Sequence, residues 1–202
     1  QNWPEFQNMT NVDWFMSEMC RTIGNKMPLL EYVKKLSPSH PARALLSISD
    51  GAPSRTRGSF YTSALTTLRL FTSKSIYAIT HTSDFTITDM GSKKQALFVI
   101  LPDEKTTFYP IASLIVSQQY ELLAEAADRR GGRLERRVNF ILDEYGNFTP
   151  ISDMTNKLTV AAGRGMRYAL FVQGFDQLKE KYSDNIANTI KRNCQVWAYL
   201  QS

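Results

Sequence analysis

The chain has 202 residues, of which 43% are hydrophobic and 21% are charged, and its formal net charge is +5. This composition excludes a disordered or low-complexity protein, and the length allows one substantial core or a core with a small helical unit. A pI near 9.2 favours a polyanionic partner, but so modest an excess of positive charge does not by itself establish DNA binding.

The N-terminal part of the chain carries helix signals. Thr10 predicts the start of a first helix, because its hydroxyl can cap the free amides of a first turn. Pro28 and Pro41 suit the first turns of a second and a third helix. A fourth helix follows the turn-forming stretch 50–58. We therefore predict a small all-helical domain over residues 1–75.

From about residue 92 the pattern changes to alternating strands and helices. Short apolar runs predict the strands, and helical spacing of apolar residues predicts the segments between them. The expected strands are 96–101, 138–142, 168–172 and 196–200, and the expected helices are 109–128, 151–162 and 175–192. Such alternation predicts an α/β domain over residues 76–202, with a parallel sheet flanked by helices.

Two acids, Asp143 and Glu144, follow the apolar run 138–142. A run of this kind is typical of a strand that is covered on both faces of a parallel sheet. Ligands of open α/β sheets bind beyond the carboxyl ends of the strands, where one carboxylate could organise the water around Mg²⁺ and another could polarise a nucleophilic water. Acids also end strands because strands end at solvent, so this segment alone leaves both interpretations open.

Two further polar residues are expected at the same edge of the sheet. Asp103 follows the first expected strand, and Gln173 follows the third. An amide beyond the strand after the acid pair could hydrogen-bond both a γ-phosphate oxygen and the attacking water. A plain amide that faces solvent is the alternative interpretation of Gln173.

The sequence contains no metal-binding motif, no redox motif and no membrane-spanning segment. Cys20 and Cys194 stand outside any metal or redox motif, and two thiols fit a reducing cytoplasm. His40 and His81 lack acidic or cysteine neighbours at ligand spacing, so we interpret both as surface residues. No stretch approaches the roughly 20 apolar residues that cross a bilayer. Because the chain begins at Gln1 rather than Met, we expect a piece of a longer protein, with any membrane anchor outside it.

Several sequence landmarks follow one another at characteristic spacings. They are Thr82-Ser83-Asp84-Phe85, the strand up to Asp103, Phe140 to Phe148, Gly163-Arg164-Gly165-Met166-Arg167, Val172 to Leu178, Tyr182 and Asn193-Cys194. In this order they resemble TraG-type coupling proteins, the membrane-anchored hexameric ATPases of type IV secretion and conjugation. The resemblance covers about residues 60–202. DNA translocases of cell division share the acid-tipped strand and are an alternative, which the later landmarks argue against.

The resemblance implies a RecA-like motor domain interrupted by an all-helical domain. It implies that Asp143 organises Mg²⁺ in a Walker B motif, that Glu144 is the catalytic base and that Gln173 senses the γ-phosphate. It also implies an arginine finger that acts across a subunit boundary, for which Arg164 is the candidate. The family often carries another arginine two residues before this position, where this chain has Ala162. Arg167 or a residue elsewhere is therefore an alternative finger, and a solvated arginine at a helix-to-strand turn is the other interpretation of Arg164.

The string G-x-x-x-x-G-K-[ST], whose amides and lysine hold nucleotide phosphates, does not occur in this sequence. In the family that loop precedes the helical domain, so we expect a C-terminal piece that lacks the nucleotide cradle. ATP and Mg²⁺ are therefore expected as cofactors only together with the loop, and the 202-residue chain alone is expected not to hydrolyse ATP.

The function implied by the resemblance is an ATP-driven pump that moves relaxase-bound single-stranded DNA into a type IV secretion channel. The expected partners are single-stranded DNA, relaxosome proteins and channel components, at the cytoplasmic face of the bacterial membrane. A homo-hexamer is expected for the full-length protein and a monomer for the isolated piece. The alternative is a non-enzymatic adaptor that docks relaxase or accessory proteins.

A basic run precedes the acid-tipped strand and includes Arg129, Arg130 and Arg133. These side chains could contact the phosphate backbone of single-stranded DNA. No aromatic residue is interleaved for base stacking, which favours a solvated loop instead. Both interpretations stay open at this point.

Overall fold

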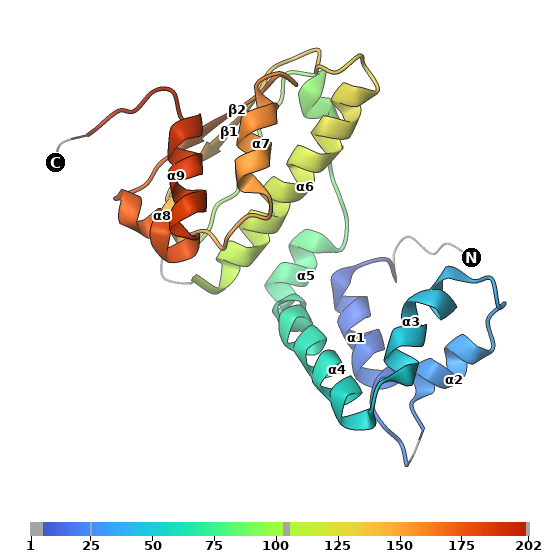
Figure 1. Cartoon of the computed structure of the whole chain (residues 1–202). Coiled ribbons are helices and arrows are strands. Elements are labelled where there is room, and N and C mark those ends of the chain that lie inside the picture. The colour runs from blue at the N-terminus through green and yellow to red at the C-terminus, as the bar shows by residue number, and fades with distance from the viewer. Residues whose placement is uncertain (1–5, 25, 103–105, 201–202) are drawn as a thin grey trace. The chain divides into compact units, whose positions relative to one another are not determined.

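The chain divides into two compact units, residues 1–84 and 85–202, in the computed structural model (Figure 1). The structure describes residues 6–24, 26–102 and 106–200. Each unit has a separate hydrophobic core. Among the helices of these described residues, none combines the length and the apolar character that a membrane span requires.

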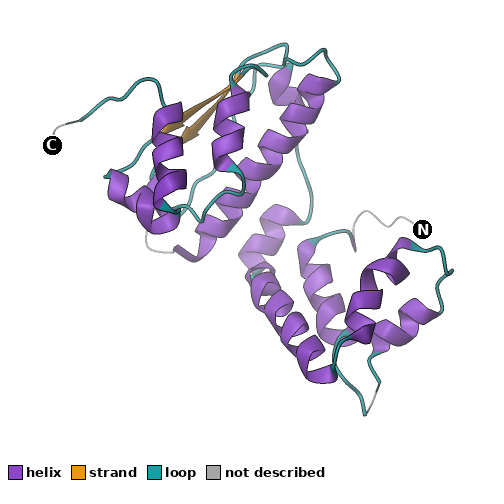
Figure 2. Ribbon diagram, in the orientation of Figure 1, coloured by secondary structure: helices purple, strands orange, loops and turns teal. Residues whose placement is uncertain are grey.

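The described residues of the first unit form helices and turns around a small core, with one isolated β-bridge (Figure 2). The helices are α1 (Met9–Met19), α2 (Pro28–Lys34), α3 (Pro41–Gly51), α4 (Ser54–Leu68) and α5 (Lys74–Thr80), with a 3-10 turn at Arg69–Thr72. Pro28 and Pro41 occupy the first turns of α2 and α3, as predicted. The residues Cys20, Met27, Leu29, Leu30 and Val33 form one buried cluster, and Phe71 and Ile76 are also buried.

The predicted helix cap at Thr10 is wrong. Asn8 caps α1, because its side chain accepts a hydrogen bond of 2.9 Å from the backbone N–H of Asn11. The Thr10 hydroxyl instead donates to the backbone carbonyl of Phe71 at 2.6 Å. Thr10 therefore ties α1 to the 3-10 turn that follows α4.

The second unit alternates helices with two parallel strands. Its elements are the 3-10 turns Ile87–Gly91 and Thr106–Phe108, α6 (Tyr109–Asp128), β1 (Val138–Leu142), the 3-10 turn Tyr145–Asn147, α7 (Met154–Ala161), β2 (Met166–Leu170), α8 (Phe175–Lys181) and α9 (Asp184–Asn193). Strand β1 pairs with β2 in parallel, with Val138 opposite Met166 and Leu142 opposite Leu170. The predicted parallel pairing of the acid-tipped strand with the next strand is thus confirmed.

One face of this sheet is buried and the other is open. Phe140 and Leu142 point into a core shared with α6, α7 and α9, which lie on the same side of the strands (Figure 1). Ile141, on the opposite face, is 70% exposed. The expectation that β1 is covered on both faces is therefore wrong in this structure.

The strands expected at 96–101 and 196–200 are also not found. The structure describes these residues, and they form neither helix nor strand. Their apolar side chains lie largely in solvent: Phe98 is 83% exposed, Ile100 91% and Leu200 90%. A strand requires a hydrogen-bonded neighbour as well as a suitable sequence. The apolar runs indicate β propensity, but within the described residues they have no strand partner.

Candidate active site

The two acids stand where β1 ends, as the sequence predicts. One Asp143 carboxylate oxygen accepts a hydrogen bond of 3.1 Å from the backbone N–H of Glu144. Glu144 itself has a left-handed backbone, with φ 49° and ψ 38°. A left-handed conformation outside glycine costs on the order of 1–3 kcal/mol and is retained where the surrounding structure enforces it, often at functional sites. The chain thus turns sharply at Glu144.

The carboxylate of Glu144 meets the side-chain amide of Gln173. The Gln173 Nε2 donates to Glu144 Oε1 at 3.2 Å and to Oε2 at 3.1 Å. Asn147 Nδ2 donates to the same Oε2 at 3.3 Å. A half-buried carboxylate therefore has amide donors from two different loops. The predicted meeting of Glu144 and Gln173 on one rim of the sheet is confirmed.

Backbone hydrogen bonds beyond the strands explain why these loops converge. The N–H of Phe171, just after β2, donates to the carbonyl of Leu142 at 3.0 Å. The N–H of Tyr145 then donates to the carbonyl of Phe171 at 2.8 Å. The two chains therefore remain paired past the last strand residues, which brings the side chains that follow within hydrogen-bonding distance.

A buried tyrosine pair supports the turn after Glu144. Tyr145 is 1% exposed, and its hydroxyl lies 2.8 Å from that of Tyr182. The Tyr182 hydroxyl also accepts a hydrogen bond of 2.9 Å from the backbone N–H of Ile151. Burial, with a smaller contribution from Tyr182, raises the pKa of Tyr145 far above its ordinary value. The Tyr145 hydroxyl stays protonated, so Tyr145 supports the turn without introducing charge.

Asp143 has the chemistry of a magnesium ligand. Asp143 is exposed at the carboxyl edge of the two strands, next to Glu144. The described residues contain no group of three or more His, Cys, Asp or Glu side chains placed to hold a metal. An exposed carboxylate of this kind fits Mg²⁺, which keeps several waters and binds through one or two carboxylates together with substrate phosphates. Asp103, the other acid expected at this rim, lies outside the described residues.

Arg164 lies at the opposite end of the strands from Glu144, because it precedes β2 whereas Gln173 follows it. Its guanidinium donates to the carbonyl of Ala124 at 3.0 Å and pairs with the Asp128 carboxylate at 2.9 Å. Both partners belong to α6. The structure therefore does not bring Arg164 to the acid pair of its own chain.

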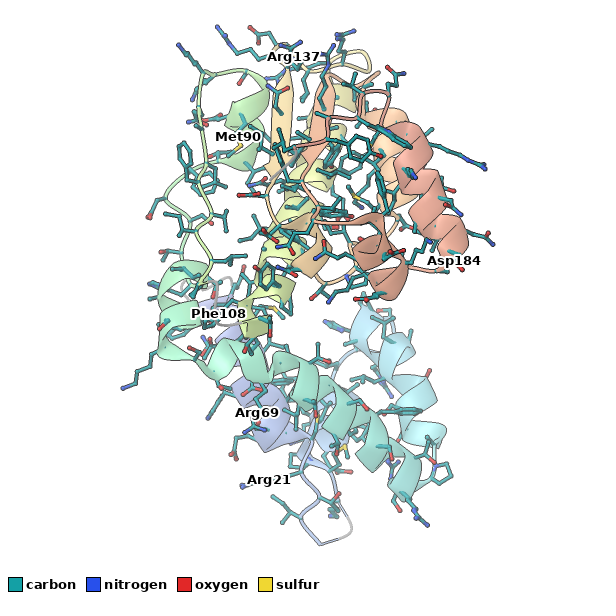
Figure 3. All side chains as sticks on the ribbon, turned by 90° about the vertical axis from the view of Figure 1, so that its left-hand side faces the viewer. Arg21, Arg69, Met90, Phe108, Arg137 and Asp184 are labelled. Carbon is teal, nitrogen blue, oxygen red and sulfur yellow. The ribbon has the colours of Figure 1, made fainter. Side chains whose placement is uncertain are left out.

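The basic run also lies at the end where β1 begins, the end marked by Arg137 in Figure 3. Arg129, Arg130 and Arg133 are exposed, and Gly131 and Gly132 turn the chain with φ of 81° and 100°. Arg129 pairs with Glu125 at 3.5 Å. No ion pair among the described residues involves Arg130 or Arg133. The loop therefore presents positive charge that is mostly not neutralised within this unit.

Two residues of the site were not predicted as functional. Asn147 contacts the Glu144 carboxylate, and Gln177 accepts a hydrogen bond from the backbone N–H of Gln173 at 3.1 Å. In the sequence they stand three residues after Glu144 and four after Gln173. Polar residues at such short spacings from a candidate site residue are the signal that could have identified them.

Comparison with known proteins places the chain in a family. The family described as "Type IV secretory system Conjugative DNA transfer" matches residues 4–202, nearly the whole chain. The chain belongs to this family. The match includes both strand ends that carry Asp143, Glu144 and Gln173.

Individual relatives point to the same family. The conjugal transfer protein TraG of Escherichia coli is 25% identical over 199 aligned residues, and the match covers 93% of this chain and 31% of the relative. Protein VirD4 of Rhizobium rhizogenes is 24% identical over 180 residues, 88% of this chain and 26% of the relative. The chain thus spans about a third or less of the length of these curated relatives. No solved structure matches the chain significantly.

Proposed function

We propose that this chain is the water-activating part of an ATP-driven coupling protein that acts in conjugative DNA transfer. The observation that carries the proposal is the contact between the Gln173 amide and the Glu144 carboxylate at the carboxyl edge of two parallel strands. Membership of the conjugative DNA transfer family supports it. In this proposal the second unit is part of a RecA-like motor domain, and the first is the helical domain inserted into it.

Each side chain at the rim has a separate role in hydrolysis. Glu144 accepts the proton of the attacking water, and Gln173 orients that water and the γ-phosphate through its amide. Asp143 would hold Mg²⁺ through the ion's water shell, and the bound ion would supply positive charge that stabilises the phosphate oxygens. The left-handed turn at Glu144 and the donor from Asn147 keep the carboxylate directed along the rim. A phosphate-holding loop outside these 202 residues completes the site.

We expect the purified 202-residue chain to show no ATP hydrolysis, because its sequence contains no P-loop to hold the phosphates. A coupled assay for released phosphate, with up to millimolar ATP and Mg²⁺, measures this. Turnover that disappears on Glu144→Gln would contradict the prediction. Turnover that survives the substitution would instead indicate a contaminating ATPase.

An adaptor without catalysis is the second candidate, supported by the exposed aromatic residues of the helical unit, such as Trp14 at 66% and Phe60 at 54%. The coding sequence upstream of Gln1 distinguishes the two. A strand followed by a P-loop, preceded by two membrane spans, would support a motor at the cytoplasmic face of the membrane. A continuous upstream reading frame without a P-loop would favour the adaptor.

The exposed arginines suggest a contact with the transported single-stranded DNA. Changing Arg129, Arg130 and Arg133 together to Ala should weaken binding of a fluorescent oligonucleotide and lower the salt slope of log K by up to about 2, at roughly 0.7 per lost phosphate contact. Fluorescence anisotropy between about 50 and 200 mM salt measures both quantities.

The matched control is the triple change Lys34→Ala, Lys74→Ala and Lys181→Ala, which removes equal positive charge from other exposed positions. It should leave the affinity almost unchanged. Equal loss of affinity in the two triple variants would show that only net charge matters, and would refute a contact at the basic run.

A further inference from the structure

Gln177 lies in the first turn of α8, four residues after Gln173. Its side-chain Oε1 accepts a hydrogen bond of 3.1 Å from the backbone N–H of Gln173. Gln173 lies in the loop before α8 and has no helical partner for that N–H. The Gln177 side chain therefore fixes the backbone from which the Gln173 amide reaches Glu144.

The same side chain packs against the turn that follows Glu144. Gly146, in the 3-10 turn Tyr145–Asn147, is buried, and a Cβ atom at this position would overlap the side-chain amide of Gln177. Its φ lies outside the left-handed region, so the backbone conformation alone does not demand glycine. A larger residue at this position would therefore have to displace the Gln177 side chain.

Gln177 thus touches both segments that carry the paired side chains. It accepts a hydrogen bond from the Gln173 backbone and packs against Gly146 in the turn after Glu144. In the same turn, Asn147 donates to the Glu144 carboxylate. A shift of Gln177 would move the Gln173 amide relative to that carboxylate.

We propose that Gln177 is a positioning residue, seated on Gly146, that holds the Gln173 amide against the Glu144 carboxylate. Among the described residues, the hydrogen bonds to the Glu144 carboxylate come from Gln173 and Asn147, so Gln177 acts through Gln173. The inference rests on the proposed function for its catalytic consequence. Its geometric content can be tested without any catalysis.

The first test follows the two side-chain amide resonances of Gln173 by ¹H–¹⁵N NMR in the 202-residue chain. Glu144→Gln should shift these resonances, because Nε2 donates to both carboxylate oxygens. Gln177→Met keeps the length of the side chain but removes the acceptor. In the Gln177→Met background, Glu144→Gln should no longer shift them, whereas Gln177→Glu, which keeps an acceptor oxygen, should preserve the shift.

A shift of equal size in the Gln177→Met background would overturn the proposal. So would loss of the shift in the Gln177→Glu background, if circular dichroism shows that this variant is folded. Gly146→Ala gives an independent check, since displacement of Gln177 by the added methyl should reproduce the effect of Gln177→Met. Unperturbed Gln173 resonances in Gly146→Ala would also count against it.

The second test measures ATP hydrolysis by the native protein that carries these residues. Gln177→Met should lower kcat by about 10- to 100-fold with little change in the KM for ATP, because a displaced group misaligns the reaction without weakening phosphate binding. An unchanged kcat would overturn the inference. A wild-type protein that hydrolyses no ATP would refute the proposed function, and the NMR comparison would then decide the positioning role by itself.

Discussion

Replacing Glu144 with glutamine should lower ATP hydrolysis by the native protein by about 10²- to 10⁴-fold, because an amide cannot accept the proton of the attacking water. The shape of the side chain is kept, so Gln173 and Asn147 can still donate to the remaining carbonyl oxygen. Nucleotide affinity should therefore persist. Steady-state phosphate release and binding of a fluorescent ATP analogue measure the two quantities separately.

Glu180→Gln is the matched control for this variant. Glu180 is exposed on α8, in the same unit, and its substitution removes the same charge. Its activity should stay within about twofold of wild type, as for most exposed positions. If Glu144→Gln retained more than half of the wild-type rate, Glu144 would not be the base.

Arg164→Ala should reduce ATP hydrolysis by about 10³- to 10⁵-fold if this arginine stabilises the transition state at a neighbouring subunit. We expect Arg164 to act on nucleotide bound to a neighbouring subunit, because in its own chain it lies at the end of the strands opposite to Glu144. Asp128→Asn controls for the ion pair on α6. Since Asp128 is 59% exposed, loss of that pair should leave the rate within about twofold.

Mixed assemblies make the test specific. Protomers with Glu144→Gln keep Arg164, and protomers with Arg164→Ala keep Glu144, so some mixed interfaces contain both intact groups. Combining the two inactive proteins before assembly should restore part of the activity. Absence of any recovery over the whole range of mixing ratios would argue against Arg164 as the finger, and the same experiment with Arg167→Ala tests the alternative.

The sequence was sufficient for those parts of the fold in which local pattern and pairing agree. The helix at 109–128 and the two parallel strands are found where apolar spacing predicts them. The runs 96–101 and 196–200 are equally apolar but form no strand among the described residues. Periodicity reports the tendency of a segment to be buried, whereas strand formation also depends on a hydrogen-bonding neighbour that the segment does not encode.

The site follows the same division. The meeting of Glu144 with Gln173 follows from topology, because the ends of parallel strands share one edge. The sequence does not predict the left-handed turn at Glu144 or the packing of Gln177 against Gly146. These features depend on contacts between a turn and a helix that is distant in sequence. For Arg164, the sequence suggested a role but not its ion pair with α6.

A structure of the native protein with Mg²⁺ and a non-hydrolysable ATP analogue would test the central claim most directly. We predict that the γ-phosphate lies at the rim formed by Asp143, Glu144 and Gln173. The Gln173 amide should lie within about 3.2 Å of a phosphate oxygen, and a water should lie between the phosphate and the Glu144 carboxylate. A nucleotide bound away from this rim, with Glu144 and Gln173 still paired to each other, would contradict the account.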